Sequence, residues 1–310
     1  MPLTNPRWID PEFASATRLE DVPDSRFVEI KERLASKIST SPIVSVVIAA
    51  WNEEVNIIRT LDSFSRNVSE FPFEVIVVNN NSRDRTQEVI DRIGVKSVFQ
   101  SIQGAGPARD MGQKEAKGTY VLQADADSYY PPTWIENMTR ELMKKGTVCV
   151  YGKHSFLGTE GNPRWQFSIY EMIRDVMTEI RQLRRPYINA LGMNMGYIRE
   201  YGVKEGYTYK NTRGEDGRLA FDLMKYGKIR LIRSRKSRVW TINRTLGKDG
   251  GLWAAFKRRV LRELANLDGY MRKPKAHNTK TTESIDASVN QSLESLKNKY
   301  TFARFFKKKK

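Results

Sequence analysis

The sequence has 310 residues and a mass of 35.8 kDa, enough for one large domain with a full hydrophobic core and appended segments. Lysine and arginine number 53 against 36 aspartate and glutamate, and the resulting net charge of +17 favours a polyanionic neighbour such as lipid, phosphorylated substrate or nucleic acid. The single cysteine, Cys149, lies in an apolar run, which excludes a disulfide framework and favours a reducing compartment.

The first 40 residues form a polar lead-in that is punctuated by proline. It contains one helical signal, because Phe27, Ile30, Leu34 and Ile38 recur on one helix face, and this helix is expected to lie across the domain. The lead-in has no apolar h-region, and the longest uncharged apolar stretch, residues 42–51, is too short to span a bilayer. We therefore expect a cytoplasmic protein, or one that is peripheral at the inner face of a membrane.

Strands alternate with helices from residue 44 to residue 151. Residues 44–50 are rich in β-branched side chains and predict a buried parallel strand. The same unit recurs, and further strands are expected at residues 73–78, 95–99, 119–124 and 148–151. Such alternation predicts an α/β, Rossmann-like, mostly parallel sheet with helices on both faces. Ligands of such a sheet gather at the carboxyl ends of its strands.

Two carboxylates end the fourth predicted strand. Asp125 and Asp127 are one residue apart, so they share a face of an extended chain. A carboxylate pair just outside a parallel sheet is well placed to hold a divalent ion against the phosphates of a nucleotide. As a bare pattern, the pair is equally typical of a solvated turn, so its surroundings decide between the two interpretations.

After residue 151 the pattern is less regular. Residues 165–184 predict a long helix, and we assign its apolar residues to packing. Those residues are Ile169, Ile173, Val176 and Ile180. The glycine-bracketed segment 192–196 can pass close to a ligand. Glu215 and Asp216 open a further predicted helix, where an acid pair is by itself most simply explained by the helix dipole.

The basic excess is concentrated near the C-terminus. Residues 252–310 contain 15 basic and five acidic side chains, and residues 228–244 contain seven basic and no acidic ones. Residues 252–267 predict an amphipathic helix, and residues 289–300 carry a second apolar helical face before an aromatic and lysine-rich end. This composition is typical of an interfacial anchor on an anionic membrane surface. We divide the chain into a lead-in (1–40), a catalytic domain (41–250) and a basic C-terminal extension (251–310).

The order of these features resembles a family 2 glycosyltransferase of the GT-A fold, over roughly residues 45–244. Residues 79–86 match the family's Asp-Asp-Gly-Ser-x-Asp-x-Thr loop, but asparagine replaces both leading acids. Residues 106–112 match its Gly-x-x-x-Ala-Arg-Asn-x-Gly segment, with Asp110 in place of the usual asparagine. Asp125-Ala126-Asp127 corresponds to the family's DxD motif, and residues 214–216 correspond to its acidic motif.

The resemblance implies an inverting, metal-dependent transfer of a sugar from a nucleotide-diphosphate sugar to an acceptor hydroxyl. The donor contacts that it implies are Ala49, Ala50, Trp51, Glu53, Asn79 at the base, Arg109 at the diphosphate and Asp125 at the ribose. Asp127, together with Asp125, would hold Mn²⁺ or Mg²⁺. Asp216, with Glu215 beside it, would act as the base that removes the acceptor proton.

The acceptor would be a saccharide or a lipid-linked molecule, as in cell-surface polysaccharide or glycolipid synthesis. A nucleotidyltransferase is an alternative, but residues 49–54 lack the glycine-rich, basic loop that grips a triphosphate. A non-enzymatic phospholipid or nucleic-acid binding module is a second alternative, and it leaves the acids at three strand ends unexplained. No RNA-binding signature with stacking aromatic residues is present, so nucleic acid is not an expected partner.

Overall fold

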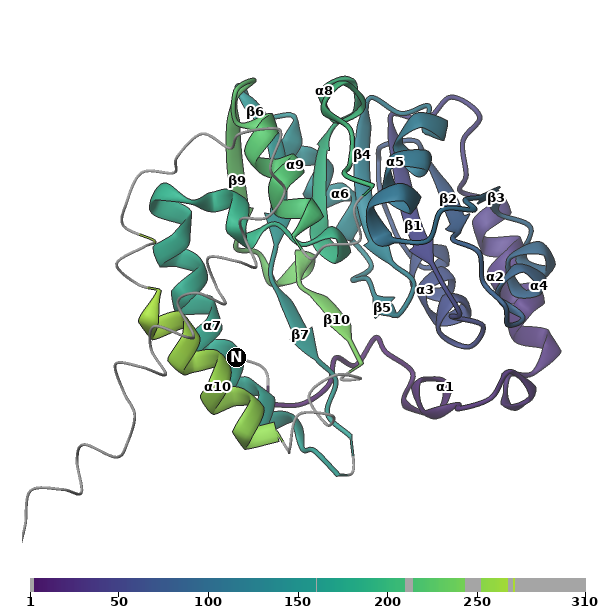
Figure 1. Ribbon diagram of the computed structural model, residues 1–310. Coiled ribbons are helices and arrows are strands. Elements are labelled where there is room, and N and C mark those ends of the chain that lie inside the picture. The colour runs from purple at the N-terminus through teal and green to yellow at the C-terminus, as the bar shows by residue number, and fades with distance from the viewer. Residues whose placement is uncertain (1–2, 160, 210–213, 243–251, 267–269, 271–310) are drawn as a thin grey trace, which may run out of the picture.

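The computed structural model describes residues 3–159, 161–209, 214–242, 252–266 and 270. A seven-stranded sheet forms the centre of this part of the chain (Figure 1). In sheet order its strands are β3 (Lys96–Phe99), β2 (Phe73–Asn79), β1 (Val44–Ala50), β4 (Tyr120–Asp125), β8 (Met195–Ile198), β6 (Thr147–Gly152) and β9 (Lys228–Ile232). All five strands predicted between residues 44 and 151 are present, so the expected α/β class with a mostly parallel sheet is confirmed.

Strand β8 is the main departure from the expected topology. It runs antiparallel to both β4 and β6, and it is inserted between them. The segment around Gly196 was expected to approach a ligand, but Gly196 lies in this strand opposite Leu122. Because β8 is antiparallel to both of its neighbours, β4 and β6 run in the same direction. The carboxyl ends of β1, β2, β4 and β6 therefore lie at one edge of the sheet.

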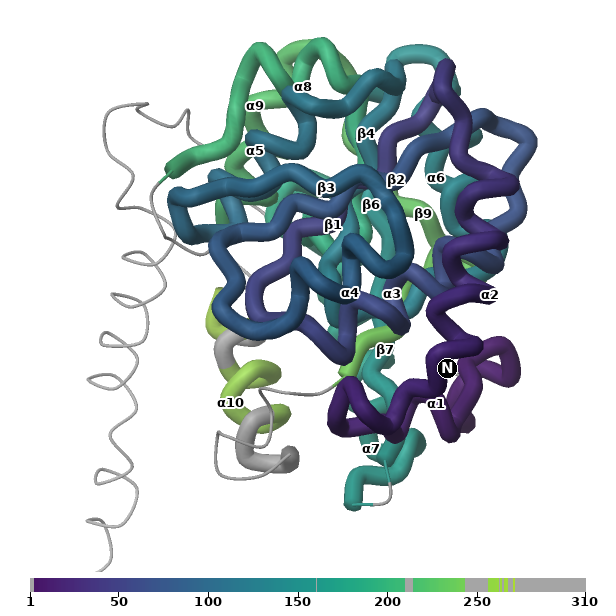
Figure 2. The backbone as a smooth tube through the Cα atoms, turned by 90° about the vertical axis from the view of Figure 1, so that its right-hand side faces the viewer, coloured from purple at the N-terminus to yellow at the C-terminus, as the bar shows by residue number. Residues whose placement is uncertain are grey.

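Helices cover both faces of the sheet, as Figure 2 shows from the side. On one face lie α2 (Asp24–Ala35), α3 (Asn56–Ser65), α4 (Thr86–Ile93) and α6 (Trp134–Leu142). The other face is covered by α5 (Ala105–Glu115), α8 (Arg199–Glu205) and α9 (Glu215–Leu223). Neighbouring strand residues point to opposite faces, so Val46 belongs to the first core and Val47 to the second. The lead-in helix α2 contributes Phe27, Ile30 and Leu34 to the first core, as its spacing predicts.

A smaller sheet extends from the carboxyl edge of the large one. Its strands, in order, are β5 (Ser128–Tyr129), β10 (Val239–Thr241) and β7 (His154–Phe156). The long helix α7 (Arg164–Arg184) packs against β7, and α10 (Leu252–Ala265) packs against α7. The short helix α1 (Pro11–Ser15) lies in the lead-in, and single 3-10 turns occupy Leu19–Asp21, Pro186–Asn189, Gly192–Asn194 and Arg235–Ser237. Both Figure 1 and Figure 2 show α7 and α10 at the end of the molecule opposite α8.

Helix α7 does not pack as its apolar spacing predicts. Ile169 and Val176 were assigned to packing, but they are 41% and 52% exposed, while Glu171 and Asp175 are buried. The assignment was wrong because the acids of this helix are satisfied inside the molecule, Glu171 by Arg164 of the same helix and Asp175 by Arg238 from outside it. Within the described residues, we find no helix that is both long enough and apolar enough to cross a membrane. The second apolar face predicted near the C-terminus, residues 289–300, lies outside the described residues.

Candidate active site

A pocket of about 540 Å³ lies at the carboxyl ends of β1 and β4. It brings together Ala49, Ala50, Trp51, Glu53, Arg109, Asp125 and Asp127, all of which were singled out from the sequence. The remaining lining residues are Asn80, Gln103, Gly104, Ala105, Ala108 and Ala126. In the parallel pairing of β1 with β4, Ala49 stands directly opposite Asp125. The register of these two central strands thus places a carboxylate beside a small residue at the floor of the pocket.

Polar contacts with buried groups hold the loop that carries the two carboxylates. The hydroxyl of Thr60, on α3, donates to the carbonyl oxygens of Ala126 and Ser128, at 2.9 and 2.8 Å. The backbone N–H of Asp125 donates to the hydroxyl oxygen of Tyr130 at 2.8 Å. The backbone on both sides of Asp127 is therefore anchored to buried groups, so the two carboxylates extend from a preorganised support.

Arg109, on α5, connects this loop with the start of α9. Its Nη2 donates to Oδ1 of Asp125 at 2.8 Å, and its Nη1 donates to Glu215 Oε1 and Asp216 Oδ1, each at 2.8 Å. The Arg109 side chain is only 6% exposed. One buried guanidinium therefore gathers acids from two motifs that are far apart in the sequence. Glu215 and Asp216 do not line the pocket as Asp125 does. They contact Arg109, which forms part of the pocket wall.

The electrostatics of this cluster are those of three carboxylates around one cation. Burial raises the pKa of Asp216 to about 6; Arg109 opposes the shift, and the neighbouring Glu215 adds to it. Burial likewise raises the pKa of Asp125, again against the effect of Arg109. Burial lowers the pKa of Arg109, but Asp216 and Asp125 more than offset this and hold it well above its ordinary value. Arg109 therefore remains charged, whereas Asp216 titrates near neutral pH.

The backbone at Gly192 completes the surroundings of Asp216. The Gly192 N–H donates to Oδ2 of Asp216 at 2.7 Å, while Arg109 holds the other oxygen. The segment 192–196 was expected to run close to a ligand. At Gly192 the structure instead shows a close approach to the Arg109 side chain.

The polar groups at the pocket fit a divalent ion that is held jointly with a nucleotide. Within the described ranges, no group of three or more His, Cys, Asp or Glu side chains is arranged to hold a metal ion. Asp125 and Asp127, however, line the same pocket. Mg²⁺ at nucleotide sites is commonly bound by one or two carboxylates together with substrate phosphate oxygens, so two carboxylates suffice for such a site.

Asn79 does not take the position expected for a base-recognising residue. It is buried, its Nδ2 donates to Gln87 Oε1, and its Oδ1 accepts from the Ser82 N–H. Asn80 lines the pocket in its place. The assignment of Asn79 is therefore corrected, because the side chain at the end of β2 points into the loop that it stabilises.

The contacts of Asn80 explain why an amide stands where the resembling family has an acid. Its Nδ2 donates to the carbonyl oxygens of Gln100 and Ile102, and its Oδ1 accepts from the Gly104 N–H. A carboxylate cannot donate, so only an asparagine can make all three bonds. Asn80 therefore ties the loop after β3 to the N-terminus of α5, and both form a wall of the pocket.

Two further features of the site were missed from the sequence. Gly104 and Ala105, at the N-terminus of α5, line the pocket, where the free N–H groups of a helix favour anions. Asp110 accepts hydrogen bonds from the Tyr207 N–H and the Tyr209 hydroxyl, at 3.1 and 2.9 Å. It was noted only as a departure from the resembling motif. In the structure, it fastens the segment that precedes α9 to the helix that carries Arg109.

Comparison with known proteins finds relatives of similar sequence. Hyaluronan synthase of Pasteurella multocida is 27% identical over 202 residues, which are 63% of this chain and 20% of that protein. Chondroitin synthase of Pasteurella multocida strain Pm70 has the same identity and coverage. The chain thus spans about a fifth of the length of these two relatives.

Solved structures show the same fold. Residues 1–349 of Staphylococcus aureus TarS, in complex with UDP, align with a TM-score of 0.51 and 20% identity, over 85% of this chain and 73% of that one. The mannosyltransferase PcManGT from Pyrobaculum calidifontis, in complex with GDP-Man and Mn²⁺, aligns with a TM-score of 0.53 and 17% identity, over 92% and 85%. The expected GT-A fold is confirmed.

The family of the protein is shown by its sequence. Residues 45–202, about half of the chain, match the profile of one family, and they include β1, the pocket-lining carboxylates and Gly192. The protein therefore belongs to glycosyl transferase family 2.

Proposed function

We propose that the protein transfers a sugar from a nucleotide-diphosphate sugar to an acceptor hydroxyl, with inversion at the anomeric carbon. The observation that carries the proposal is the position of Arg109. It lines the pocket and holds Asp125 of the strand-end pair together with Glu215 and Asp216. A donor-binding region and an acid pair suited to proton transfer thereby meet at one point. UDP in the TarS complex and GDP-Man in the PcManGT complex support a nucleotide-sugar donor for this fold.

The donor would occupy the pocket at the ends of β1 and β4. Ala49 and Ala50 leave room for the nucleoside, and Trp51 and Glu53 lie beside it in the pocket wall. The diphosphate would lie near the N-terminus of α5 and Arg109, because both provide positive potential. Asp125 would contact the ribose.

Asp125 and Asp127 would hold Mn²⁺ or Mg²⁺ when the donor binds. Such an ion stabilises negative charge on the departing nucleoside diphosphate. The Mn²⁺ in the PcManGT complex supports a divalent ion at this kind of site.

The reaction assigned to the acid pair is a direct displacement. The acceptor oxygen attacks the anomeric carbon, the bond between that carbon and the diphosphate oxygen breaks, and the acceptor proton passes to the Asp216 carboxylate. A carboxylate with a pKa of about 6 is still ionised at neutral pH and is a stronger base than an ordinary aspartate. Glu215, held by the same Arg109 nitrogen, would orient the pair. Attack from the side opposite the leaving group gives inversion.

The acceptor and the location form the second part of the proposal. The two Pasteurella relatives are named as polysaccharide synthases, which supports a saccharide or lipid-linked acceptor. We propose that residues 41–250 act as the catalytic domain on the cytoplasmic side of a membrane. The lead-in (1–40) would support that domain, and the basic extension (251–310) would attract anionic lipid.

A panel of nucleotide sugars tests the donor proposal. Each is offered with and without Mn²⁺ or Mg²⁺, and both thermal stabilisation and release of nucleoside diphosphate are measured. The expected result is metal-dependent stabilisation and hydrolysis with at least one donor, and loss of both in Asp127→Ala. If every donor fails to stabilise the protein at any metal concentration, the proposed function is wrong.

A further inference from the structure

A second pocket lies at the same edge of the sheet as the donor pocket. Its volume is about 180 Å³, and Tyr151 and Gly152, the last two residues of β6, form part of its lining. We call it the β6 pocket. Only β8 separates β6 from β4, so the ends of these two strands are about 10 Å apart, which is two strand spacings. The β6 pocket is smaller than sites that enclose a whole ligand, so it suits one substituent of a larger molecule.

The β6 pocket adjoins the residue proposed as the base. Asn189 and Leu191 line the pocket, and the next residue, Gly192, donates its N–H to Oδ2 of Asp216 at 2.7 Å. The Asn189 side chain donates to the Tyr151 hydroxyl at 2.9 Å, which ties this segment to the end of β6. A molecule with one substituent in the β6 pocket would therefore extend past Leu191 toward Asp216.

Helix α7 provides a polar wall of the β6 pocket. Arg174, Asp175, Thr178 and Arg181 line it, and their spacing places them on one side of the helix. Lys153, between β6 and β7, lines it as well. The side chains of Lys153 and Arg174 are each only 14% exposed. The pocket thus presents cations that are largely shielded from water, where an ionic contact is stronger than at an open surface.

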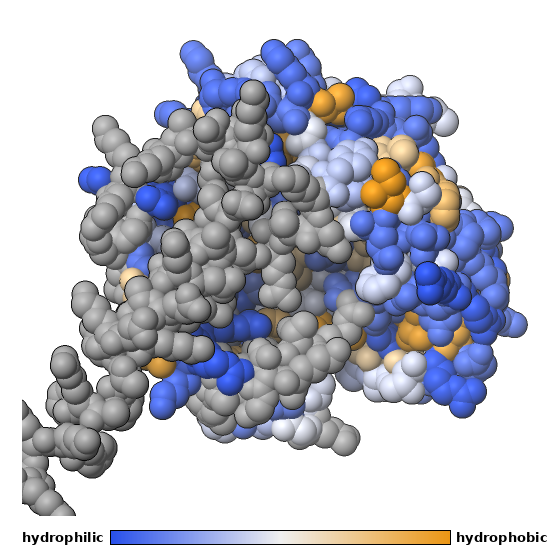
Figure 3. All heavy atoms as spheres, in the orientation of Figure 1, coloured by the Kyte–Doolittle hydropathy of each residue, from blue (hydrophilic) through white to orange (hydrophobic). Residues whose placement is uncertain are grey.

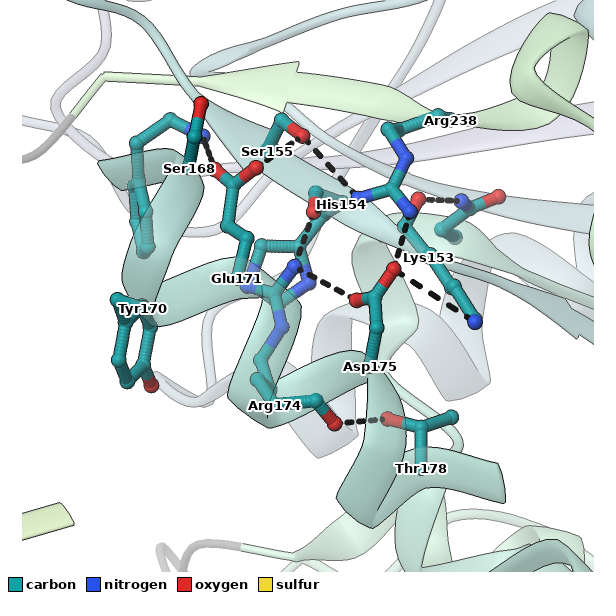
Figure 4. A network of polar contacts seen from close by, with 12 residues as sticks. Lys153, His154, Ser155, Ser168, Tyr170, Glu171, Arg174, Asp175, Thr178 and Arg238 are labelled. Atoms are coloured by element: carbon teal, nitrogen blue, oxygen red, sulfur yellow. Dashed lines mark hydrogen bonds and ion pairs between the residues drawn. The ribbon is translucent and has the colours of Figure 1, made fainter. Parts of the chain in front are cut away.

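A single carboxylate faces three cations beside this pocket, as Figure 4 shows. Lys153 Nζ lies 3.6 Å from Asp175 Oδ2, Arg174 Nη2 lies 3.5 Å from Asp175 Oδ1, and Arg238 donates to Asp175 Oδ2. Among the residues that the structure describes, none donates a hydrogen bond to the buried Asp175 Oδ1. A network with only a structural role is expected to satisfy such an atom, so these contacts are not those of a closed structural network.

The ion pairs around the pocket leave an excess of positive charge. Within the described ranges, the pairs that involve its lining join five cations to three acids. The cations are Lys153, Arg174, Arg181, Arg233 and Arg238, and the acids are Asp175, Glu179 and Glu263. His154 adds no charge, because burial, reinforced by nearby arginines, holds its pKa well below the ordinary value. Its Nε2 lies 2.7 Å from Arg174 Nη1 and accepts from it, since an arginine can only donate.

Arg174 differs in this respect from Arg109 of the donor pocket. Burial lowers the pKa of both arginines. At Arg109, Asp216 and Asp125 more than offset the effect of burial, whereas at Arg174 the neighbouring Glu171 does not. Arg174 is therefore a buried cation whose charge is compensated less fully, and an anion beside it would supply the missing compensation.

We propose that the β6 pocket binds an oxyanion of the acceptor, a carboxylate or a phosphate, through Lys153 and Arg174. The inference rests on the proposed function, because it names the class of acceptor whose hydroxyl meets Asp216. The planar guanidinium suits two oxygens of such a group, and the ammonium adds a point charge. Figure 3 shows that hydrophilic residues make up most of the coloured part of that face, which suits a charged acceptor. Anchoring the anion would fix the orientation of the hydroxyl that reacts.

Titration calorimetry with the bare anionic groups tests the pocket in the full chain. Inorganic phosphate and acetate are the probes, and acetamide has the shape of acetate without its charge. Each is titrated with and without nucleoside diphosphate and Mg²⁺, because an anion bound in the donor pocket is displaced by the nucleotide and one in the β6 pocket is not. At least one anion is expected to bind in both conditions, and acetamide in neither. The anion that binds more tightly distinguishes a phosphate from a carboxylate.

Matched variants locate the binding. Lys153→Gln should bind the anion at least about tenfold more weakly, because a charge-assisted hydrogen bond is lost. Arg174→Lys keeps the charge but loses the planar fork, and it should also bind more weakly. Arg233→Gln is the control, because Arg233 pairs with Glu179 as Lys153 does but is 63% exposed and lies outside the pocket lining. It should bind like the parent.

Transfer kinetics extend the test to the acceptor. With a donor identified by the nucleotide-sugar panel, glucose, glucuronate and glucose phosphate are compared as acceptors. An anionic acceptor should have the higher kcat/KM, and Lys153→Gln should raise its KM more than it lowers kcat. Hydrolysis of the donor by the parent without acceptor is measured in parallel. Failure of the donor proposal is therefore seen separately, and the calorimetry does not depend on it.

Three results would overturn the proposal. The first is that the parent binds neither phosphate nor acetate when the nucleotide is present. The second is parent-like anion binding by folded Lys153→Gln, and Arg174→Lys takes its place if the melting temperature shows that Lys153→Gln does not fold. The third is an equal loss of binding in Arg233→Gln, which would assign the effect to general surface charge.

Discussion

Gly192 lies against the guanidinium of Arg109, and a Cβ atom at Gly192 would be 2.2 Å from Arg109 Cζ. Any side chain at this position must displace the group that gathers Asp125, Glu215 and Asp216. Gly192→Ala is therefore expected to lower kcat/KM for sugar transfer by roughly 10²-fold, the scale of a misplacement of about 1 Å at a reacting centre. Steady-state kinetics measures the effect.

Gly161→Ala serves as the control, because a Cβ at Gly161 meets nothing within 4 Å. It should leave both kinetics and melting temperature unchanged. Parent-like activity of Gly192→Ala would show that the position of Arg109 does not matter for transfer.

Asp127→Ala should abolish metal-dependent binding of the nucleoside diphosphate. One of the two carboxylates proposed to hold the ion is lost, and the phosphates of the ligand cannot replace it. Titration calorimetry with nucleoside diphosphate, in the presence and absence of Mn²⁺, gives the comparison. Asp91→Ala, which removes an exposed acid from α4, should bind like the parent. Equal Mn²⁺-dependent affinity for the parent and Asp127→Ala would remove Asp127 from the metal site.

The pH dependence of transfer should follow the ionisation of Asp216. A base accepts a proton only when it is ionised, and the pKa of Asp216 is raised to about 6, chiefly by burial. The value of kcat/KM should therefore rise with pH through about 6 and level off above it. Profiles of kcat/KM recorded at saturating metal test this.

Asp216→Asn should retain donor binding while kcat falls by roughly 10²-fold or more. Glu215→Gln serves as the comparison, because Glu215 is bonded to the same Arg109 nitrogen as Asp216. This variant should retain the fall of kcat/KM at low pH, which we call the acid limb. A parent-like acid limb in Asp216→Asn would assign the titration to another group. Equal loss of donor binding and transfer would point to a structural role for Asp216.

Asn80→Asp should destabilise the loop that forms the pocket wall. The substitution removes the two N–H bonds to the carbonyl oxygens of Gln100 and Ile102 and places a negative charge beside them. We expect the free energy of unfolding to fall by about 1–3 kcal/mol, the cost of leaving buried polar groups unsatisfied. Denaturant unfolding measures this, and Asn81→Asp, at a partly exposed neighbouring position, should change stability little.

Glu171→Ala should destabilise the packing of α7 strongly. It leaves Arg164 buried without its partner, and the loss of one member of a buried ion pair costs about 3–5 kcal/mol. Glu88→Ala breaks the exposed pair with Arg85 and is expected to have little effect on the denaturation midpoint. Similar midpoints for the two variants would show that the orientation of α7 does not depend on Glu171.

The central part of the fold was predictable from the sequence, because its signals are local. A β-branched run such as residues 44–50 can bury both faces only in a covered sheet, and the position of Asp125 and Asp127 at a strand end follows from where the apolar run stops. The helix face of Phe27, Ile30 and Leu34 is likewise a property of spacing. The family resemblance rests on the same short segments.

Features that depend on contacts between distant residues required the tertiary structure. Strand β8 has only four residues, one of them Gly196, and it exists because β4 and β6 offer it partners on both sides. The sequence alone does not show that Asn80, and not Asn79, lines the pocket. This depends on which of the two side chains points toward the pocket at the end of β2.

Helix α7 shows most clearly what could not be predicted from the sequence alone. Its spacing predicts an apolar face that packs inward, but Ile169 and Val176 are exposed, while Glu171 and Asp175 are buried against Ser155 of β7 and Arg238, which precedes β10. Likewise, the family resemblance marks Arg109 as a diphosphate contact and Asp216 as the base, each separately. Their pairing arises only when α5 and α9 pack on the same face of the sheet, where burial makes the interaction strong.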